Sequence, residues 1–461
     1  MDIVVSQGDW FINVRTFLRT RRFFMKKKFL MIISLILVML SVLGACNSDK
    51  NGEETTAAVE SNTGEDAANA DAPLLVNDIS ITEYTVVYDA RVSIGSDAAM
   101  KYFKSKLNQQ YKIEIEPETR EVDGYQILIG VAGTDSSINE FFSTCEEGMI
   151  GFDGKNIYLL SKDNQGIYSV VDAFFAKAVE SDGRSHISIS QNEKVAMTKD
   201  EITVMSYNVL YDLSAEQYRD LPALANLIKE QSPDVFGTQE ALDAHKTAIL
   251  EAMPNYQCYT GVKLKGGAGM SNMIFWNADK FKAIEKGFQY LTDTPYIESK
   301  IPESNSYRGF SYVILESLTT GKQFMFIDVH LTYRNADGET NDDGTRLKQA
   351  KYLIKFLENK KYEAMPIILV GDFNSVPSSQ TLTAVENVKR FDRTAWVAKN
   401  KGDLGGTTTR AVRTIRDTYE FDHIFVTSDR ISTQYFSAID KKVDGRYPAD
   451  HLPVIAKIAI Y

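Results

Sequence analysis

Several side chains in the second half of the sequence could bind a metal ion or move a proton. A carboxylate, Glu240, ends one apolar run, and His330 ends another. Asp372, Asp422 and His451 stand at the edges of three further runs. Carboxylates and imidazoles are the usual general acids and bases of enzymes, and a hard oxygen ligand such as Glu240 suits Mg²⁺ or Mn²⁺. Because the sequence has no His/Cys cluster with metal-type spacing, zinc is disfavoured.

The runs that must position these side chains have the composition of buried strands. There are five such runs, and Val, Ile, Phe and Met are their main apolar residues: 202–210, 233–240, 324–330, 367–374 and 421–426. A strand that stops on a polar residue places it at the sheet edge, where α/β proteins build their sites. Residues 223–230 and 241–253 have the apolar spacing of helices. This order predicts an α/β domain with its chemistry at one edge of a sheet.

The polar residues at the strand ends also follow an ordered pattern. It reads Asn208, Gln239-Glu240, His330, Gly371-Asp372-x-Asn374, Asp422 and Asp450-His451. The pattern resembles the endonuclease/exonuclease/phosphatase superfamily, which includes deoxyribonuclease I, over residues 200–461. The resemblance implies a four-layered α/β sandwich, in which two packed mixed sheets carry helices on their outer faces.

The same resemblance implies roles for individual residues. The implied metal site consists of Asn208, Glu240 and Asp450. The implied catalytic residues are His330, Asp372, Asn374, Asp422 and His451. We assign the general base to His451, oriented by Asp422, while Asp372 stays open as the alternative. Asn272 and Arg346 are expected to bind substrate, and for Arg346 a purely structural role is equally open.

Phosphoester hydrolysis is the chemistry that this set of residues suits. Phosphate esters repel anionic nucleophiles, so their hydrolysis calls for a divalent cation, a base for water and in-line positioning. We expect a Mg²⁺- or Mn²⁺-dependent phosphoesterase that acts on phosphodiesters or phosphomonoesters. Two alternatives stay open: an extracellular nuclease, which a basic patch at Lys263 and Lys265 would favour, and a non-catalytic ligand-binding lipoprotein.

Two further histidines are expected to be structural. His245 follows Glu240 in a helix-like segment and matches no motif, so packing is the favoured role. His423 is one residue past Asp422, and strand alternation sends it to the opposite face.

The amino terminus has the pattern of an export signal. A basic cluster ending at Lys28 precedes an uncharged stretch, residues 29–43, and the small residues before Cys46. This ending resembles the bacterial lipobox, which implies lipidation of Cys46 and anchoring outside the cytoplasmic membrane; an ordinary signal peptide is the alternative. The expected organisation is a misassigned start or extension (1–24), a signal peptide (25–45) and a polar, disordered tether (46–73).

Residues 74–196 are predicted to form a separate small α/β domain. Strands are expected at residues 85–88, 112–115, 126–130 and 156–160, and helices at residues 98–107 and 169–179. The order resembles the accessory domain that precedes the catalytic domain in some secreted glycoside hydrolases. Because it holds one histidine, His186, and no evident acid cluster, a supporting role is favoured over catalysis.

Composition limits the partners. With 44% hydrophobic and 25% charged residues the chain is globular, and its formal net charge of −11 makes it a poor general binder of long polyanions. Nucleic acid is therefore expected only as a substrate. Cys145 and Cys258 are too few for a disulfide framework. We expect a monomer whose partners are its phosphoester substrate and, through the lipid, a membrane.

Overall fold

The computed structural model describes residues 73–461, apart from 89–93, 131–135, 145–146, 163, 214–219, 266–268, 335, 339–342, 389–390 and 411–412. Residues 1–24, the predicted signal peptide 25–45 and Cys46 lie outside the described residues, as does all of the predicted tether except residue 73. Within the described part, no helix has both the length and the apolar character needed to cross a membrane.

The region before residue 196 contains two sheets with a shared core. One sheet has the order β2-β1-β8-β7, formed by Ile79–Ser80, Leu74–Val76, Arg184–Ile187 and Val179–Ser181. The other has the order β3-β4-β6-β5-β9, formed by Tyr84–Tyr88, Tyr125–Ile129, Ile157–Ser161, Gly148–Phe152 and Glu193–Val195. Phe103 of α2 (Ile94–Tyr111) and Phe174 of α4 (Gly166–Phe175) are fully buried and pack against each other in this core. The two sheets and the two helices therefore share one cluster of buried apolar side chains.

One expected strand in this region does not form. Residues 112–115 belong to no strand, and Lys112, which directly follows α2, has a left-handed backbone with φ 61°. Only Glu118, further along, bonds to the edge of β3, where its N–H donates to the carbonyl of Val86. The prediction of a strand at these residues is therefore wrong. Alternation of apolar and polar residues indicates a half-buried surface, but it does not supply a strand to pair with.

The region from residue 200 onward is built on two mixed sheets. The first is seven-stranded, β12-β13-β11-β10-β24-β23-β19, formed by Tyr256–Tyr259, Ser271–Asn277, Val235–Ala241, Asp200–Asn208, Val454–Ile460, Ile431–Ala438 and Asn400–Lys401. The second is six-stranded, β14-β15-β16-β17-β22-β18, formed by Phe281–Tyr290, Gly309–Ser317, Gln323–His330, Ile367–Asp372, Asp422–Thr427 and Phe391–Arg393. Near-continuous burial along β16, β17 and β22 explains why these segments are apolar runs instead of alternating ones.

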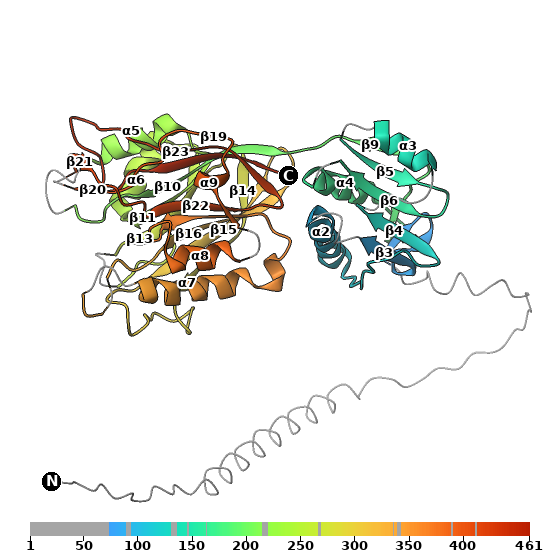
Figure 1. Ribbon diagram of the computed structural model, residues 1–461, viewed down its shortest axis with the longest axis horizontal. Coiled ribbons are helices and arrows are strands. Elements are labelled where there is room, and N and C mark those ends of the chain that lie inside the picture. Colours follow the sequence, from blue (N-terminus) through green and yellow to red (C-terminus); the bar gives the residue numbers. More distant parts are fainter. Residues whose placement is uncertain are drawn as a thin grey trace, which may run out of the picture. The chain divides into compact units, whose positions relative to one another are not determined.

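The two sheets pack face to face, and helices cover their outer sides (Figure 1). Val204 of β10 and Ile368 of β17 share the core between the sheets. The next residue, Met205, points the other way and packs with α5 (Leu221–Gln231) and α6 (Asp243–Ala252). The second sheet likewise packs Leu369 against α7 (Asp343–Leu357) and α8 (Gln380–Glu386). The predicted four-layered α/β sandwich is confirmed.

Local signals define the ends of the helices. Asp220 caps α5 because its carboxylate accepts a hydrogen bond from the backbone N–H of Ala223, and Pro222 occupies the first turn. Ser232 ends the helix in a left-handed conformation. The chain then turns directly into β11, whose far end carries Glu240.

Candidate active site

Strand pairing brings the polar strand ends together. In the second sheet β16 and β17 run parallel with His330 opposite Asp372, and β22 pairs antiparallel to β17 with Asp422 opposite Asp372. Three candidate residues therefore lie side by side across three neighbouring strands. In the first sheet, β10 and β11 run parallel with Asn208 opposite Gln239, which places Glu240 beyond that pair.

A direct hydrogen bond joins the two sheets at this edge. The side-chain amide of Asn208 donates to Oδ2 of Asp372 at 3.0 Å, and both residues are buried. The other carboxylate oxygen of Asp372 accepts from the backbone N–H of Asn374 at 2.8 Å. The Asp372 carboxylate is thus held from both sides in one orientation.

Glu240 is aimed by a bulge in β11. The pairing register between β11 and β13 shifts between Thr238 and Ala241, and Glu240 within this interval has a left-handed backbone, φ 60°. Bulges re-aim side chains, and strained non-glycine conformations persist where the surrounding structure imposes them, often at functional sites. Among the described residues, the carboxylate of Glu240 accepts one hydrogen bond, from the backbone N–H of Tyr211 at 3.2 Å.

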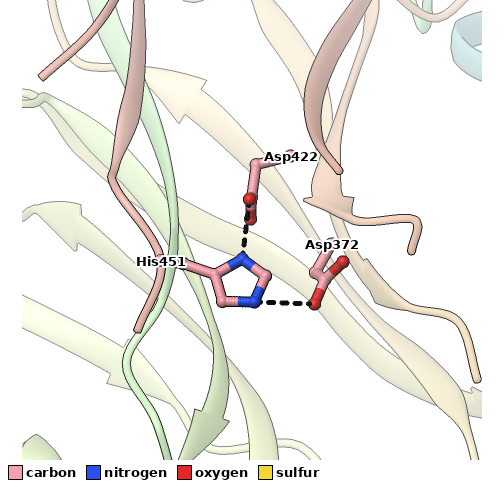
Figure 2. Close-up of side chains that lie close together, drawn as sticks. All are labelled: Asp372, Asp422 and His451. Atoms are coloured by element: carbon pink, nitrogen blue, oxygen red, sulfur yellow. Dashed lines mark hydrogen bonds and ion pairs between the residues drawn. The ribbon is translucent and has the colours of Figure 1, made fainter. Parts of the chain in front are cut away.

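Three titratable groups are linked in sequence: the imidazole of His451 lies between the carboxylates of Asp422 and Asp372 (Figure 2). Nδ1 of His451 lies 2.8 Å from Oδ2 of Asp422, and Nε2 lies 3.7 Å from Oδ2 of Asp372. The hydroxyl of Thr407 also donates to Oδ2 of Asp422 at 2.7 Å. Asp422 therefore orients the imidazole, as the sequence predicted, and the Nε2 side faces Asp372.

His330 and Asn374 occupy the adjoining side of the cluster. Nε2 of His330 lies 3.2 Å from the amide nitrogen of Asn374, 3.4 Å from Oδ2 of Asp372 and 4.0 Å from Oε1 of Glu240. The same amide nitrogen donates to the carbonyl of Leu331 at 3.0 Å. His330 thus lies between the carboxylates of Glu240 and Asp372.

Burial and mutual charge shift the protonation of these groups. Burial raises the pKa of Asp372 to about 7, with a further increase from Asp422, although His451 opposes it. Burial alone would lower the pKa of His451, but the Asp422 and Asp372 carboxylates raise it well above its ordinary value. Burial, with a contribution from Arg308, holds the pKa of His330 well below its ordinary value. These directions favour a neutral imidazole at His330 and a protonated one at His451.

The residues fit a hard divalent cation. Burial raises the pKa of Glu240, and repulsion from Asp450 raises it further, so a cation between these carboxylates would relieve an unfavourable pair. Oδ1 of Asp450 is buried without a hydrogen-bond partner among the described residues. Carboxylate oxygens and the amide oxygen of Asn208 are the donors that Mg²⁺ and Mn²⁺ prefer.

A second grouping also has the spacing of a metal site. Ligand atoms of Asp372, Asp422 and His451 all lie within 4.8 Å of one another. Because Asp422 already holds Nδ1 of His451 and Asp372 faces Nε2, this group has the arrangement of a proton carrier.

Most of these residues line one cleft of about 580 Å³, namely Glu240, His330, Asp372, Asn374, Asp450 and His451, whereas Asn208 and Asp422 are not among its lining residues. The structure also adds members that the sequence analysis missed. The cleft is also lined by Arg308 and Arg334 and by the aromatic residues Tyr211, Tyr333, Tyr419 and Phe421. The sequence could have indicated Arg308, because this charged residue directly precedes an apolar run, Gly309–Ser317. That run forms β15, which pairs with β16, the strand of His330. The aromatic residues lie on loops and had no comparable signal.

Two predicted substrate-binding residues do not reach the cleft. Asn272 is 1% exposed, and its amide donates to the backbone carbonyls of Asp328 at 3.1 Å and Gly309 at 3.4 Å. It ties β13 to the second sheet, so its predicted role as a substrate ligand is wrong. Arg346 is 6% exposed in α7, where its Nε donates to the hydroxyl of Ser375 at 3.1 Å. These contacts are those of a packing residue, and a role of Arg346 in substrate binding stays a prediction.

The two remaining histidines are structural, as expected. Nδ1 of His245 accepts from the backbone N–H of Leu242 at 3.0 Å and so caps the start of α6. His423 is buried on the opposite face from Asp422, where Nε2 contacts the carbonyl of Ser375 at 2.9 Å.

Comparison with known proteins agrees with this geometry. Residues 205–451 match the model of the Endonuclease/Exonuclease/phosphatase family. Carbon catabolite repressor protein 4 homolog 3 of Arabidopsis thaliana is 27% identical over 210 residues, which cover 41% of this chain and 43% of that protein. The chain thus spans less than half the length of this relative.

Solved structures share the fold. An endonuclease/exonuclease/phosphatase family protein from Bacteroides thetaiotaomicron superposes with a TM-score of 0.52 at 23% identity, covering 57% of this chain and 99% of that chain. A second, from Bacteroides vulgatus, gives a TM-score of 0.50 at 20% identity, covering 57% and 100%. The family match spans more than half of the sequence and includes the strand ends described above, and its members are metal-dependent hydrolases of phosphoester bonds. The chain therefore belongs to the endonuclease/exonuclease/phosphatase family.

Proposed function

We propose that the chain is a Mg²⁺- or Mn²⁺-dependent phosphoesterase that acts outside the cytoplasmic membrane, held there by a lipid on Cys46. The observation that carries the enzymatic part is the convergence of Glu240, His330, Asp372 and His451 on one cleft. These groups come from strands of both sheets, and a dead or purely binding descendant would have no need to keep them in register. The anchoring part rests on the sequence alone.

Glu240, Asp450 and Asn208 would hold the metal ion, which neutralises phosphoryl oxygens when bound. The chain itself supplies the proton handling. Asp372, fixed by Asn208 and by the N–H of Asn374, accepts a hydrogen bond from the attacking water. His451, held by Asp422, exchanges a proton at Nε2 on the side that faces Asp372. This arrangement supports Asp372 as the acceptor and His451 as the proton carrier, in place of the sequence-based assignment of the base to His451 alone.

The nuclease alternative gains no support from the lysines that would have favoured it. Nζ of Lys263 lies 2.5 Å from Oδ2 of Asp243, and Nζ of Lys265 lies 3.4 Å from Oε1 of Glu298. Because both cations already have acidic partners, they offer a phosphate backbone little net charge.

The test is a hydrolysis panel with Mg²⁺ or Mn²⁺ on p-nitrophenyl phosphate, bis(p-nitrophenyl) phosphate, sugar and inositol phosphates, sphingomyelin, DNA and RNA. Glu240→Gln should weaken metal binding by about tenfold or more, because it removes the charged ligand. Asp372→Asn should keep metal binding and lower turnover by roughly 10²–10⁴-fold. Calorimetry with Mn²⁺ separates the two effects. Unchanged metal affinity in Glu240→Gln would remove the metal assignment, and a wild type that hydrolyses no ester would refute the function.

A further inference from the structure

Arg308 is a buried cation at the cleft that the reaction scheme above does not use. It is 7% exposed, directly precedes β15 and lines the cleft. The carboxylates of Glu240 and Asp372 act on it electrostatically. A buried charge is costly unless it is paired or has a ligand to bind, so its partners decide what it is for.

Backbone carbonyls hold the guanidinium, and they use only part of it. Nε donates to the carbonyl of Leu331 at 3.2 Å, and Nη1 donates to the carbonyl of Tyr307 at 3.2 Å. Leu331 directly follows His330, so the anchor fixes Arg308 relative to the catalytic strand β16. Nη2 donates to no described residue, and no described carboxylate lies within the 4.0 Å of an ion pair with Arg308.

The arrangement differs from that of Arg393 and Arg430, two other buried arginines of this region. Arg393 is ion-paired with Glu386 at 2.7 Å, and Arg430 uses Nε and Nη2 on the terminal carbonyl of Tyr461. In both of these arginines the terminal nitrogen Nη2 is therefore held by another residue of the fold. In Arg308 backbone carbonyls hold Nε and Nη1, so Nη2 is left for a ligand in the cleft.

We propose that Arg308 is a substrate-binding residue that donates from Nη2 to a non-bridging oxygen of the phosphoryl group. The inference rests on the proposed phosphoesterase function and adds a residue that the family motifs in this sequence do not include. A guanidinium suits a phosphoryl oxygen because its donors are planar, permanently charged and already oriented by the protein. Negative charge is shared among the non-bridging oxygens during transfer, so a fixed donor there lowers the barrier.

A rival role is that Arg308 only keeps Glu240 ionised, since its charge opposes the increase in the pKa of Glu240. The two roles predict different measurements. A phosphoryl ligand affects phosphate binding directly, whereas a partner of Glu240 affects metal binding first.

The experiment compares Arg308→Ala and Arg308→Lys with Arg334→Ala, an exposed arginine of the same cleft, in the full chain with Mn²⁺. Arg308→Ala should lower kcat/KM by about 100-fold on p-nitrophenyl phosphate and bis(p-nitrophenyl) phosphate alike, as loss of one preorganised donor does elsewhere. Arg308→Lys should recover only part of this loss, because an ammonium lacks the planar fork. Added guanidinium ions should restore activity to Arg308→Ala and leave Arg334→Ala unchanged.

Calorimetry with inorganic phosphate provides a readout besides turnover. Phosphate affinity in the Mn²⁺-loaded protein should fall by about tenfold or more in Arg308→Ala, with Mn²⁺ affinity retained. If Arg308→Ala fails to fold, the comparison is made with Arg308→Lys, whose fold is checked by circular dichroism. Unchanged phosphate affinity, or a loss that follows Mn²⁺ affinity without guanidinium rescue, would overturn the proposal. If the wild type binds phosphate through Arg308 but hydrolyses no ester of the full substrate panel, the phosphoesterase function is refuted and the phosphate-binding role of Arg308 is kept.

Discussion

At the scale of residues, the cleft contains groups whose protonation and backbone conformation depart from their ordinary states. Glu240 and Asn374 both have left-handed backbones, with φ of 60° and 48°. Such conformations cost about 1–3 kcal/mol each and persist only when the surroundings impose them. In Glu240 the conformation coincides with a bulge that turns the carboxylate into the cleft, so the strain has a direct structural consequence.

Buried histidines outside the cleft affect stability more simply. Burial lowers the pKa of His245 to about 4, from an ordinary value of 6.5. The native state therefore keeps this imidazole neutral, while the unfolded chain protonates it as the pH falls below 6.5. Its contribution to stability is complete above that pH and is lost as the pH falls toward 4. The depressed pKa of a histidine thus makes the protein less stable in acid.

A substitution can test this dependence. His245→Asn keeps an acceptor for the N–H of Leu242, which starts α6, but removes the titration. Between pH 7.5 and pH 5 the free energy of unfolding of wild type should fall more than that of the variant, by about 2 kcal/mol. Urea titrations at the two pH values measure the difference. Identical pH dependence in both proteins would show that the pKa of His245 is not lowered in the native state.

At the scale of elements, the site depends on the register of parallel strands. Gly371 lies opposite Val329 and immediately before Asp372, with φ 155°. A Cβ at this position would collide with the backbone carbonyl of Val329. The close approach of β17 to β16 therefore requires glycine, and this approach sets His330 opposite Asp372.

Gly371→Ala should separate the two strands and displace both catalytic side chains. Overpacking costs about 1–3 kcal/mol, and 1 kcal/mol corresponds to about 2–4 °C in a domain of this size, so Tm should fall by roughly 5–10 °C. Activity should fall with it. Gly321→Ala is the matched control, since Gly321 also has a positive φ, 71°, but nothing lies within 4 Å of its Cβ position. Equal losses in both variants would mean that backbone strain alone, and not the contact with Val329, is responsible.

At the scale of the whole molecule, the clusters of buried residues in the described chain fall into two groups: two clusters lie before residue 190, and the others lie after residue 200. All candidate catalytic residues belong to the second part, within the family match of residues 205–451. No described residue of the first part lines the cleft that holds most of them.

Anchoring is the prediction that concerns the whole protein, and its residues lie outside the described part. In the expressing bacterium, Cys46→Ala should move the protein from the membrane fraction to the soluble fraction or leave an unprocessed precursor. The reason is that acyl chains on the cysteine, and not a spanning helix, are proposed to hold it. Fractionation with immunoblotting measures both outcomes, with Cys258→Ala as the control. Normal processing together with full membrane retention would contradict the lipobox interpretation.

The sequence by itself determined the fold class and the set of strand-end residues, because both depend on local patterns. Apolar runs that stop at Asn208, Glu240, His330 and Asp372 specify buried strands and the polarity of their ends. The structural roles of His245 and His423 followed from the same kind of argument, the first from the missing motif and the second from alternation along a strand.

Only the tertiary structure decided which side chains meet. Asn208 and Asp372 are 164 positions apart and belong to different sheets, so their hydrogen bond depends on how the sheets pack. The same packing brings Arg308 into the cleft and leaves Asn272 tying the sheets together beneath it. Local propensity determines where strands begin and end, but long-range pairing and the burial of whole faces determine which of their ends become a site.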